Sequence, residues 1–403
     1  MAMIMAVNAG SSSIKFQLLE MPEEKVIASG VMERIGLEEG IFTLKYDGKK
    51  EETHPVLPTH AEGVQLLLDT LVAKNICKLS EIAGVGHRVV QGGEYFKDSA
   101  FATEENIEKV LELADLAPLH NKAHVVGIRA FQKVLPNVPQ VLVFDTTFHQ
   151  TMLDEAYMYA TPYEWYEKYG IRKYGAHGTS HQYVSHRCAE LMGMPLEDTK
   201  IIVCHLGNGA SISAVKGGKC IDTSMGLTPL EGIPMGTRSG NIDPTALEVV
   251  AKHENKSISE LIQILNKKSG LYGMSGISND ARDVTAGMNR GEYRCKMAFA
   301  VQSKRIMDYI GSYYVYLGGC DAICFTAGMG ENLCHLREKI CNRLGVLGVK
   351  IDTEINNKTF GTETLISTPD SKIKVYVLPT NEEVMIARDV MRIAKIWQNI
   401  LIN

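Results

Sequence analysis

The sequence predicts an α/β protein whose buried strands end in polar loops, and two observations lead to this prediction. Five short apolar runs, which begin near residues 4, 141, 201, 322 and 375, each end abruptly in a polar, glycine-rich or acidic cluster. Short apolar runs bounded by turn residues are typical of buried strands. Between these runs, apolar residues recur at helical spacing. Because α/β proteins place ligands at strand ends, these clusters are the candidate functional sites.

Length and composition bound the class of protein. A chain of 403 residues is long for one hydrophobic core, so we expect two domains. The net charge of −5 gives no support for a nucleic-acid or anionic-membrane partner, and no apolar run approaches the roughly 20 residues of a membrane span. The nine cysteines include no CxxC pair, which favours buried free thiols over zinc. Together with the missing signal peptide, this predicts a cytoplasmic protein.

Hydrophobic spacing places the secondary structure. A strand is predicted over 82–90, one arm of a hairpin over 43–46, and a complete hairpin over 201–222. Helices are predicted over 60–74, 103–113, 123–135, 246–253, 258–267, 295–317 and 383–399. The segments that begin at Asn8 and Asn208 each follow an apolar run and carry a serine three residues later. This echo predicts two related halves, each with a hairpin turn at its strand end.

Two kinds of segment are suited to phosphate. The segment 8–15 combines a glycine, three serines and Lys15, so that backbone N–H groups, hydroxyls and an ammonium group are available to phosphate oxygens. It lacks the spacing of a P-loop, and a plain serine-rich turn is the alternative. Arg88 and Arg238 each lie in a glycine-flanked loop, where a guanidinium group can bind phosphate as a bidentate fork. The alternative for either arginine is a surface salt bridge.

Two carboxylates are candidate metal ligands. Asp145 and Glu382 each follow a predicted strand, and acids that converge on one point suit a Mg²⁺ ion. The alternative for Asp145 is the cap of a helix.

The segment 177–181 contains several hydrogen-bonding side chains close together. A catalytic role and a structural role are equally expected for these residues. His177 and His181 have a spacing that also suits zinc, but no third ligand lies nearby and Gly178 argues against a helix there. The polar loops at 275–283 and 328–332 are suited to ribose and purine contacts.

Taken together, these segments resemble the acetate kinase family, which belongs to a superfamily with sugar kinases, actin and chaperone ATPases. The resemblance covers nearly the whole chain, in ordered blocks at 8–15, 86–90, 116–121, 143–146, 174–181, 205–211, 236–240, 325–332 and 380–383. It implies reversible phosphoryl transfer between ATP and acetate, giving ADP and acetyl phosphate. The reaction would need Mg²⁺, which Mn²⁺ can replace.

The resemblance also implies an architecture of two related domains with ribonuclease-H-like βββαβαβα cores around a central cleft. One domain would contain 1–146 and 384–403. The other, 147–383, would bind nucleotide and form the contact of a homodimer.

Carried over residue by residue, the resemblance implies four sets of site residues. The catalytic residues would be Asp145 and the four that surround the transferring phosphoryl group, Asn8, Arg88, His177 and Arg238. The metal would be held by Asn8, Asp145 and Glu382. The acyl group would be bound by Arg88, Val90, Leu119, His120, Ala176 and Pro229. The nucleotide would be held by Ser11, Lys15, His205, Gly207, Asn208, Gly209, Asp280, Ala281, Arg282, Gly328, Met329, Gly330 and Asn332.

Three positions depart from the family pattern. Gln91 stands where the family usually has His, and Asn241 stands where it usually has Asp. Ala176 stands where the family usually has Phe, inside the implied acyl pocket, which leaves room for an acid larger than acetate.

The chemistry of the acceptor shapes the expected mechanism. A carboxylate is already ionised at neutral pH, so it needs no general base. The obstacle is repulsion between two anions, which Arg88, Arg238 and a metal on Asp145 and Glu382 would offset if they meet between two lobes. We therefore expect Asp145 to position the metal, and transfer to be direct and in line. The alternatives are a propionate-preferring kinase of the same family and, from another class, a nucleotide-driven partner-binding ATPase.

Overall fold

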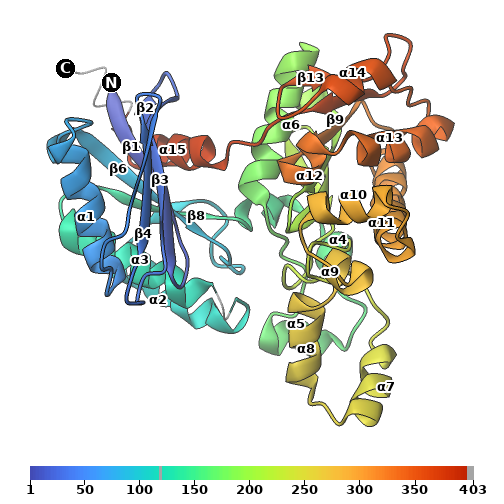
Figure 1. Cartoon of the computed structure of the whole chain (residues 1–403), viewed down its shortest axis with the longest axis horizontal. Helices are drawn as coiled ribbons and strands as arrows, with labels where there is room; N and C mark the ends of the chain where they lie inside the picture. The colour runs from blue at the N-terminus through green and yellow to red at the C-terminus, as the bar shows by residue number, and fades with distance from the viewer. Residues whose placement is uncertain (118–119, 397–403) are drawn as a thin grey trace. The chain divides into compact units, whose positions relative to one another are not determined.

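A computed structural model of the chain describes residues 1–117 and 120–396, and it divides into two compact units (Figure 1). Unit 1 comprises Met1–Thr147 together with the segment from Asn381 onward, and unit 2 comprises Phe148–Thr380.

Unit 1 is built on an eight-stranded sheet with the order β5-β4-β3-β2-β1-β6-β8-β7. Strands β1 to β5 form an antiparallel meander, whereas β6 and β8 run parallel to β1. The strands are β1 (Ala2–Ala9), β2 (Ser13–Met21), β3 (Lys25–Glu33), β4 (Ile41–Tyr46), β5 (Lys49–Thr53), β6 (Ile82–Val89), β7 (Ala100–Phe101) and β8 (Gln140–Phe144).

Helices cover both faces of this sheet (Figure 1). On one face, α3 (Asn121–Val134) packs beside α1 (His60–Ala73) and α2 (Glu104–Glu112), and its Phe131 contacts the ring of His87 on β6. The other face carries α15 (Glu382–Ile393), which approaches β6 closely. A Cβ atom on Gly86 would lie 2.3 Å from the side chain of Ile386, so only glycine permits this approach. Successive strand residues face opposite sides, so Arg88 lies on the α15 face.

Unit 2 has a six-stranded sheet with the order β11-β10-β9-β12-β14-β13. The strands are β9 (Lys200–Leu206), β10 (Ala210–Lys216), β11 (Lys219–Thr223), β12 (Ala322–Thr326), β13 (Thr364–Leu365) and β14 (Lys374–Val377). The sheet contacts α6 (Gly178–Met192) and the long α11 (Tyr293–Leu317). The remaining helices are α4 (Asp154–Tyr157), α5 (Tyr163–Tyr169), α7 (Thr245–Glu254), α8 (Ile258–Lys267), α9 (Gly270–Ser275), α10 (Ala281–Asn289), α12 (Ala327–Asn332), α13 (Cys334–Arg343) and α14 (Thr353–Lys358).

The two sheets share one core topology. The order β3-β2-β1-β6-β8 in unit 1 is matched by β11-β10-β9-β12-β14 in unit 2, with the same antiparallel and parallel pairings. The echo at Asn8 and Asn208 falls on equivalent turns, which join β1 to β2 and β9 to β10. The predicted α/β class and the prediction of two related halves are therefore confirmed.

Several local predictions were wrong. Gly178 was expected to argue against a helix, yet α6 begins at this residue. The conformational-entropy cost of glycine is a cost in the middle of a helix, and Gly178 is the first helical residue. The segment 328–332 was expected to be a loop but forms most of the short helix α12. Arg88 lies within strand β6, not in a loop.

The helix predicted over 383–399 is observed as α15, which ends at Ile393. Residues 397–399 of that prediction lie outside the described residues. Among the described residues, no helix is long and apolar enough to cross a membrane. All nine cysteines are free thiols.

Candidate active site

In unit 1, parallel strands bring an arginine and two acids together. Arg88 lies near the end of β6 and Asp145 directly follows β8, and the register pairs these two strands up to Val89 and Phe144. Arg88 Nε donates to Asp145 Oδ1 at 2.9 Å, and Nη2 donates to Oδ2 at 2.6 Å. Glu382, the first residue of α15, lies 3.9 Å from Arg88 Nε through its Oε2. The fork geometry expected for a phosphate is thus used here to hold a carboxylate.

The charges of this cluster are strongly coupled. Burial disfavours the charged form of Arg88, but attraction to Asp145 and Glu382 outweighs it and raises the pKa of Arg88. Burial raises the pKa of Glu382 to about 7, helped by the negative charges of Asp145 and Glu383 and opposed by Arg88. A carboxylate in this state is stabilised by any further positive charge, and a divalent cation would supply it.

A small cavity joins this cluster to the paired ends of β1 and β2, where Asn8 lies opposite Lys15. Its volume is about 20 Å³, and its lining includes Asn8, Lys15, Arg88 and Glu382. Ser11, the other residue of this segment that was expected to hold phosphate, lies in the turn between the strands and is exposed. The amide oxygen of Asn8 and the two carboxylates form a set of oxygen donors of the type that Mg²⁺ prefers. Among the described residues, no three His, Cys, Asp or Glu side chains form a metal site by themselves.

In unit 2, the β9–β10 turn collects a second set of groups. The rings of His177 and His205 stack, with centroids 4.1 Å apart and planes at 22°. A Cβ atom on Gly209 would lie 3.5 Å from Nε2 of His177 and 3.3 Å from Nη1 of Arg238. A Cβ atom on Gly207 would lie 3.8 Å from Nε2 of His205. Two imidazoles and a guanidinium group therefore border one glycine-rich turn.

Arg238 differs from Arg88 in its partners. Among the described residues, its side chain makes one hydrogen bond, from Nη1 to the sulfur of Met235 at 3.8 Å, and no carboxylate lies within ion-pair distance. Burial without a compensating acid lowers its pKa. A half-buried cation with no acidic partner attracts an anion.

A cavity of about 700 Å³ lies beside this turn. Its lining is Gly207, Asn208, Asn279, Asp280, Ala281, Arg282, Gly328, Met329, Asn332 and Leu333. Most residues expected to hold the nucleotide are therefore together, and sequence reasoning missed only Asn279 and Leu333 from this lining. Five expected residues are not part of this lining: Ser11 and Lys15 of unit 1, His205 and Gly209 at the turn, and Gly330, whose carbonyl oxygen accepts from Arg337 Nη1 at 2.9 Å. This volume is of the size that small-molecule sites have.

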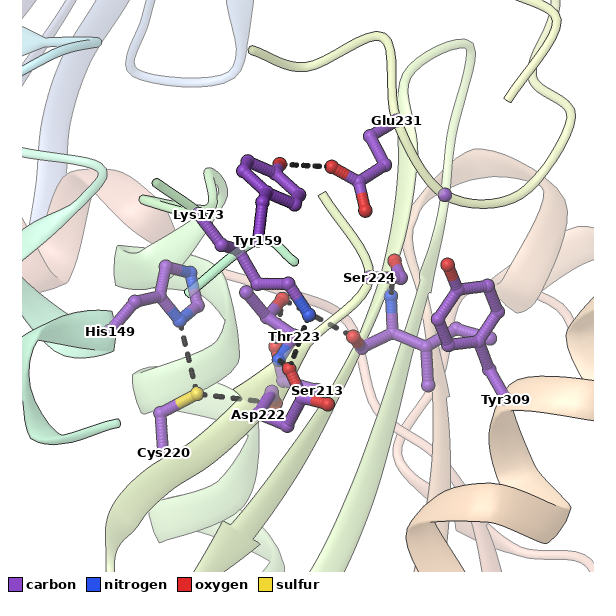
Figure 2. Close-up of polar contacts among 12 residues, drawn as sticks. His149, Tyr159, Lys173, Ser213, Cys220, Asp222, Thr223, Ser224, Glu231 and Tyr309 are labelled. Carbon is purple, nitrogen blue, oxygen red and sulfur yellow. Dashed lines mark hydrogen bonds and ion pairs between the residues drawn. The ribbon is translucent and has the colours of Figure 1, made fainter. Parts of the chain in front are cut away.

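The backbone around His177 is held by a polar layer behind it. His177 itself has a left-handed φ of 60°, which few residues adopt without support. His149 Nε2 lies 3.1 Å from the carbonyl oxygen of Ala176, and its Nδ1 lies 3.1 Å from Cys220 Sγ. Figure 2 shows the contact between His149 and Cys220, together with the ion pair of Lys173 and Asp222, in which Nζ and Oδ1 are 2.7 Å apart. The loop that presents His177 is thus tied to strand β11.

The residues expected to bind the acyl group are divided between the units. Val90 and His120 belong to unit 1, and Ala176 and Pro229 belong to unit 2. Leu119 lies outside the described residues.

The other two departures from the family pattern have structural partners. Gln91 is buried, and its Oε1 accepts from the N–H of Gly93 at 2.9 Å. Asn241 Oδ1 accepts from the N–H of Gly232 at 2.8 Å, and its Nδ2 donates to the hydroxyl of Tyr309 at 2.9 Å.

Sequence reasoning missed two serine hydroxyls that contact the histidines and a threonine hydroxyl that contacts one of these serines. Ser211 Oγ lies 2.9 Å from Nδ1 of His177, Ser180 Oγ lies 2.7 Å from Nδ1 of His205, and Thr380 Oγ1 donates to Ser180 Oγ at 2.7 Å. Ser180 and Ser211 stood in segments already singled out, but nothing in their spacing shows which histidine each would meet.

Comparison with known proteins gives a consistent result. The model of the acetokinase family matches residues 3–388. The chain is 55% identical over 397 residues to an acetate kinase of Bacillus cytotoxicus, covering 98% of this chain and all of that protein. It is 57% identical over 391 residues to an acetate kinase of Phytoplasma mali, covering 97% and 99%.

Solved structures agree. The crystal structure of Porphyromonas gingivalis acetate kinase superposes with a TM-score of 0.94 at 43% identity, covering 98% of this chain and 100% of that one. A propionate kinase from Francisella tularensis gives a TM-score of 0.92 at 41% identity, covering 97% and 100%.

Proposed function

The chain belongs to the acetokinase family, and from this premise we propose how its residues act in the reaction. The protein is an acetate kinase, a phosphotransferase that moves a phosphoryl group between ATP and acetate to give ADP and acetyl phosphate. The geometric observation that supports this chemistry best is Arg238, which is half-buried beside the glycine turn and the 700 Å³ cavity and has no acidic partner among the described residues. Such a group requires an anion, and a nucleotide phosphate supplies one.

The two clusters are assigned different tasks in this proposal. The cavity of unit 2 binds the nucleotide, while His177, His205 and Arg238 donate hydrogen bonds to its phosphates. Asn8, Asp145 and Glu382 of unit 1 would hold Mg²⁺, which would supply positive charge to offset that of the phosphates. Arg88 orients the buried Asp145 through two hydrogen bonds, and its positive charge also attracts the acyl carboxylate.

Asp145 acts as a positioning residue, not as a base. Both of its oxygens already accept hydrogen bonds from Arg88, and its side chain is only 1% exposed. Its oxygens are therefore engaged with Arg88, and the ionised acetate has no proton to give. Direct in-line attack of an acetate oxygen on the terminal phosphorus, with ADP leaving, therefore needs no proton transfer in unit 1.

A propionate-preferring enzyme is the second candidate, because Ala176 is smaller than the usual Phe and a propionate kinase is among the structural relatives. We further propose a homodimer located in the cytoplasm, in keeping with nine unpaired thiols.

The deciding experiment is a coupled assay of ADP formation with ATP and Mg²⁺ across formate, acetate, propionate and butyrate. The highest kcat/KM with acetate supports the proposal, and a maximum at propionate supports the second candidate. ADP release that no acid stimulates would refute both.

A further inference from the structure

Two chains of hydrogen bonds end on the stacked histidines of unit 2, and the direction of each chain is set by which atoms can donate. From these chains we infer that Ser180 and Ser211 are positioning residues that fix His205 and His177 as neutral donors with the proton on Nε2. The inference rests on the proposed function only for the identity of the ligand, a nucleotide phosphate.

The chain that reaches His205 begins at Thr380. Thr380 Oγ1 donates its proton to Ser180 Oγ at 2.7 Å, so the single proton of Ser180 is free for another acceptor. The remaining partner of Ser180 is Nδ1 of His205 at 2.7 Å, and Ser180 is fully buried. A buried hydroxyl proton without an acceptor is costly, so Ser180 donates to Nδ1. Neutral His205 then carries its own proton on Nε2.

The chain that reaches His177 begins at His181. Ser211 Oγ lies 2.7 Å from Nε2 of His181 and 2.9 Å from Nδ1 of His177, and it has one proton for the two rings. His181 is fully buried, and burial lowers its pKa far below the usual value, so its ring is neutral.

The other nitrogen of His181 decides the direction of this chain. Among the described residues, Nδ1 of His181 has no hydrogen-bond partner. An orphaned N–H group is rarer and more costly than an orphaned lone pair, so the proton of His181 sits on Nε2 and is donated to Ser211. Ser211 therefore donates to Nδ1 of His177, which leaves the proton of His177 on Nε2.

Both Nε2 atoms lie at the β9–β10 turn, near Gly209 and Gly207 respectively, at the positions given above. Two imidazolium rings with centroids 4.1 Å apart would repel each other and Arg238, whereas two neutral N–H donors do not. The pair is therefore built to donate hydrogen bonds to phosphate oxygens and not to accept a proton.

The inference is tested first on the unmodified protein, by the ¹⁵N resonances of its histidine rings with and without ADP. We expect His177, His181 and His205 each to show a protonated Nε2 and an unprotonated Nδ1. A proton on Nδ1 of His177 or His205 overturns the inference. This measurement is independent of acetate kinase activity, so its failure is distinguishable from failure of the proposed function.

Variants then test the serines. Ser211→Ala should shift the Nδ1 resonance of His177 and lower kcat by about 10- to 100-fold, because the donor that faces phosphate is no longer oriented. The matched control is Ser213→Ala, on the same strand and face, whose Oγ donates to Thr223 at 2.8 Å (Figure 2). Ser213→Ala should leave the His177 resonances and kcat close to wild type. Equal effects of the two variants would contradict a specific role for Ser211.

Two replacements of His177 distinguish a hydrogen-bond donor from a general base. The amide of His177→Gln places an N–H group near the position of Nε2, whereas that of His177→Asn reaches only the position of Nδ1. We expect Gln to keep at least about tenfold more activity than Asn, a difference of about 1.4 kcal/mol. Equal and complete loss in both variants would favour a base and contradict the inference.

Discussion

Arg88 and Asp145 form a bidentate ion pair, with Nε and Nη2 of the arginine 2.9 Å and 2.6 Å from the two carboxylate oxygens. The pair is largely buried, since the side chain of Arg88 is 20% exposed and that of Asp145 is 1% exposed. Arg238 in unit 2 has no such partner among the described residues. We therefore expect replacement of Arg88 to lower the free energy of unfolding and replacement of Arg238 not to lower it, although both arginines take part in the proposed reaction.

Replacing Arg88 should damage both stability and activity. Arg88→Ala leaves Asp145 buried and unpaired, which costs about 3–5 kcal/mol of unfolding free energy. We expect kcat to fall by roughly 10²- to 10⁵-fold. Arg88→Lys should recover part of the stability but little activity, because an ammonium group cannot reproduce the fork. Denaturant titration and the coupled assay measure the two quantities, with the surface variant Arg129→Ala as control. Full activity in Arg88→Lys would count against the account.

Replacing Arg238 should damage activity alone. Arg238→Ala removes a half-buried cation that no acid compensates among the described residues, so its unfolding free energy should equal or exceed that of the wild type. The loss in kcat should again be on the order of 10²- to 10⁵-fold. A variant that is destabilised as strongly as Arg88→Ala would show that Arg238 has a structural partner in solution.

Removing the charge of Glu382 should weaken metal binding. We expect Glu382→Gln to raise the Mg²⁺ concentration for half-maximal activity on the order of 10- to 100-fold, because one charged ligand is lost. Direct titration with Mn²⁺ in the presence of ADP, followed by electron paramagnetic resonance, gives a second readout. Glu104→Gln, a surface change in the same unit, is the control. An unchanged metal requirement would remove Glu382 from the ligand set.

Unit 1 should lose stability in mild acid because it buries two neutral histidines. Burial lowers the pKa of His87 to about 4, and burial together with the charge of Arg88 lowers that of His124 to about 4. The unfolded chain, with a histidine pKa of about 6.5, binds more protons than the folded one between these values. Stability is thus fully present above about pH 6.5 and falls as the pH drops toward 4, by up to about 3 kcal/mol per histidine.

Denaturant titrations of the wild type and His87→Gln at a series of pH values between 4 and 7 test this prediction. The variant should show a shallower loss of unfolding free energy with falling pH, since glutamine does not titrate. Identical slopes would show that His87 is not held neutral in the folded protein.

Enlarging Ala176 should change the choice of acid. Ala176 is 3% exposed, so Ala176→Phe should reduce kcat/KM for propionate relative to acetate by about 10- to 200-fold if the side chain borders the acyl group. Ala176→Val serves as a second variant with a smaller increase in volume, because inserting a phenyl group into a packed region costs about 1–3 kcal/mol of unfolding free energy. An unchanged ratio in two folded variants would place Ala176 away from the acyl group.

Much of the fold was predictable because its signals are local. Apolar runs predicted the central strands, and the Asn8 and Asn208 echo predicted the repeated topology, since both depend on neighbouring residues. The start of α6 at Gly178 was not predictable from local preference, because tertiary contacts at His177 determine it.

The candidate site was predictable in its residue types but not in its pairings. Both arginines look alike in sequence, and only the register of β6 with β8 shows that Arg88 is neutralised by Asp145. The hydroxyl partners of His177 and His205 come from β10 and α6, and Thr380 in the segment before α15 donates to the partner of His205. Such contacts join residues up to 200 positions apart, which no sequence spacing reveals.

The most direct test of the central claim is the product itself. Incubation with ATP, Mg²⁺ and acetate in the presence of hydroxylamine traps any acyl phosphate as acetyl hydroxamate. The account predicts hydroxamate in amounts equal to the ADP formed, and none without acetate. ADP formed at the same rate without acetate, with no hydroxamate, would contradict it.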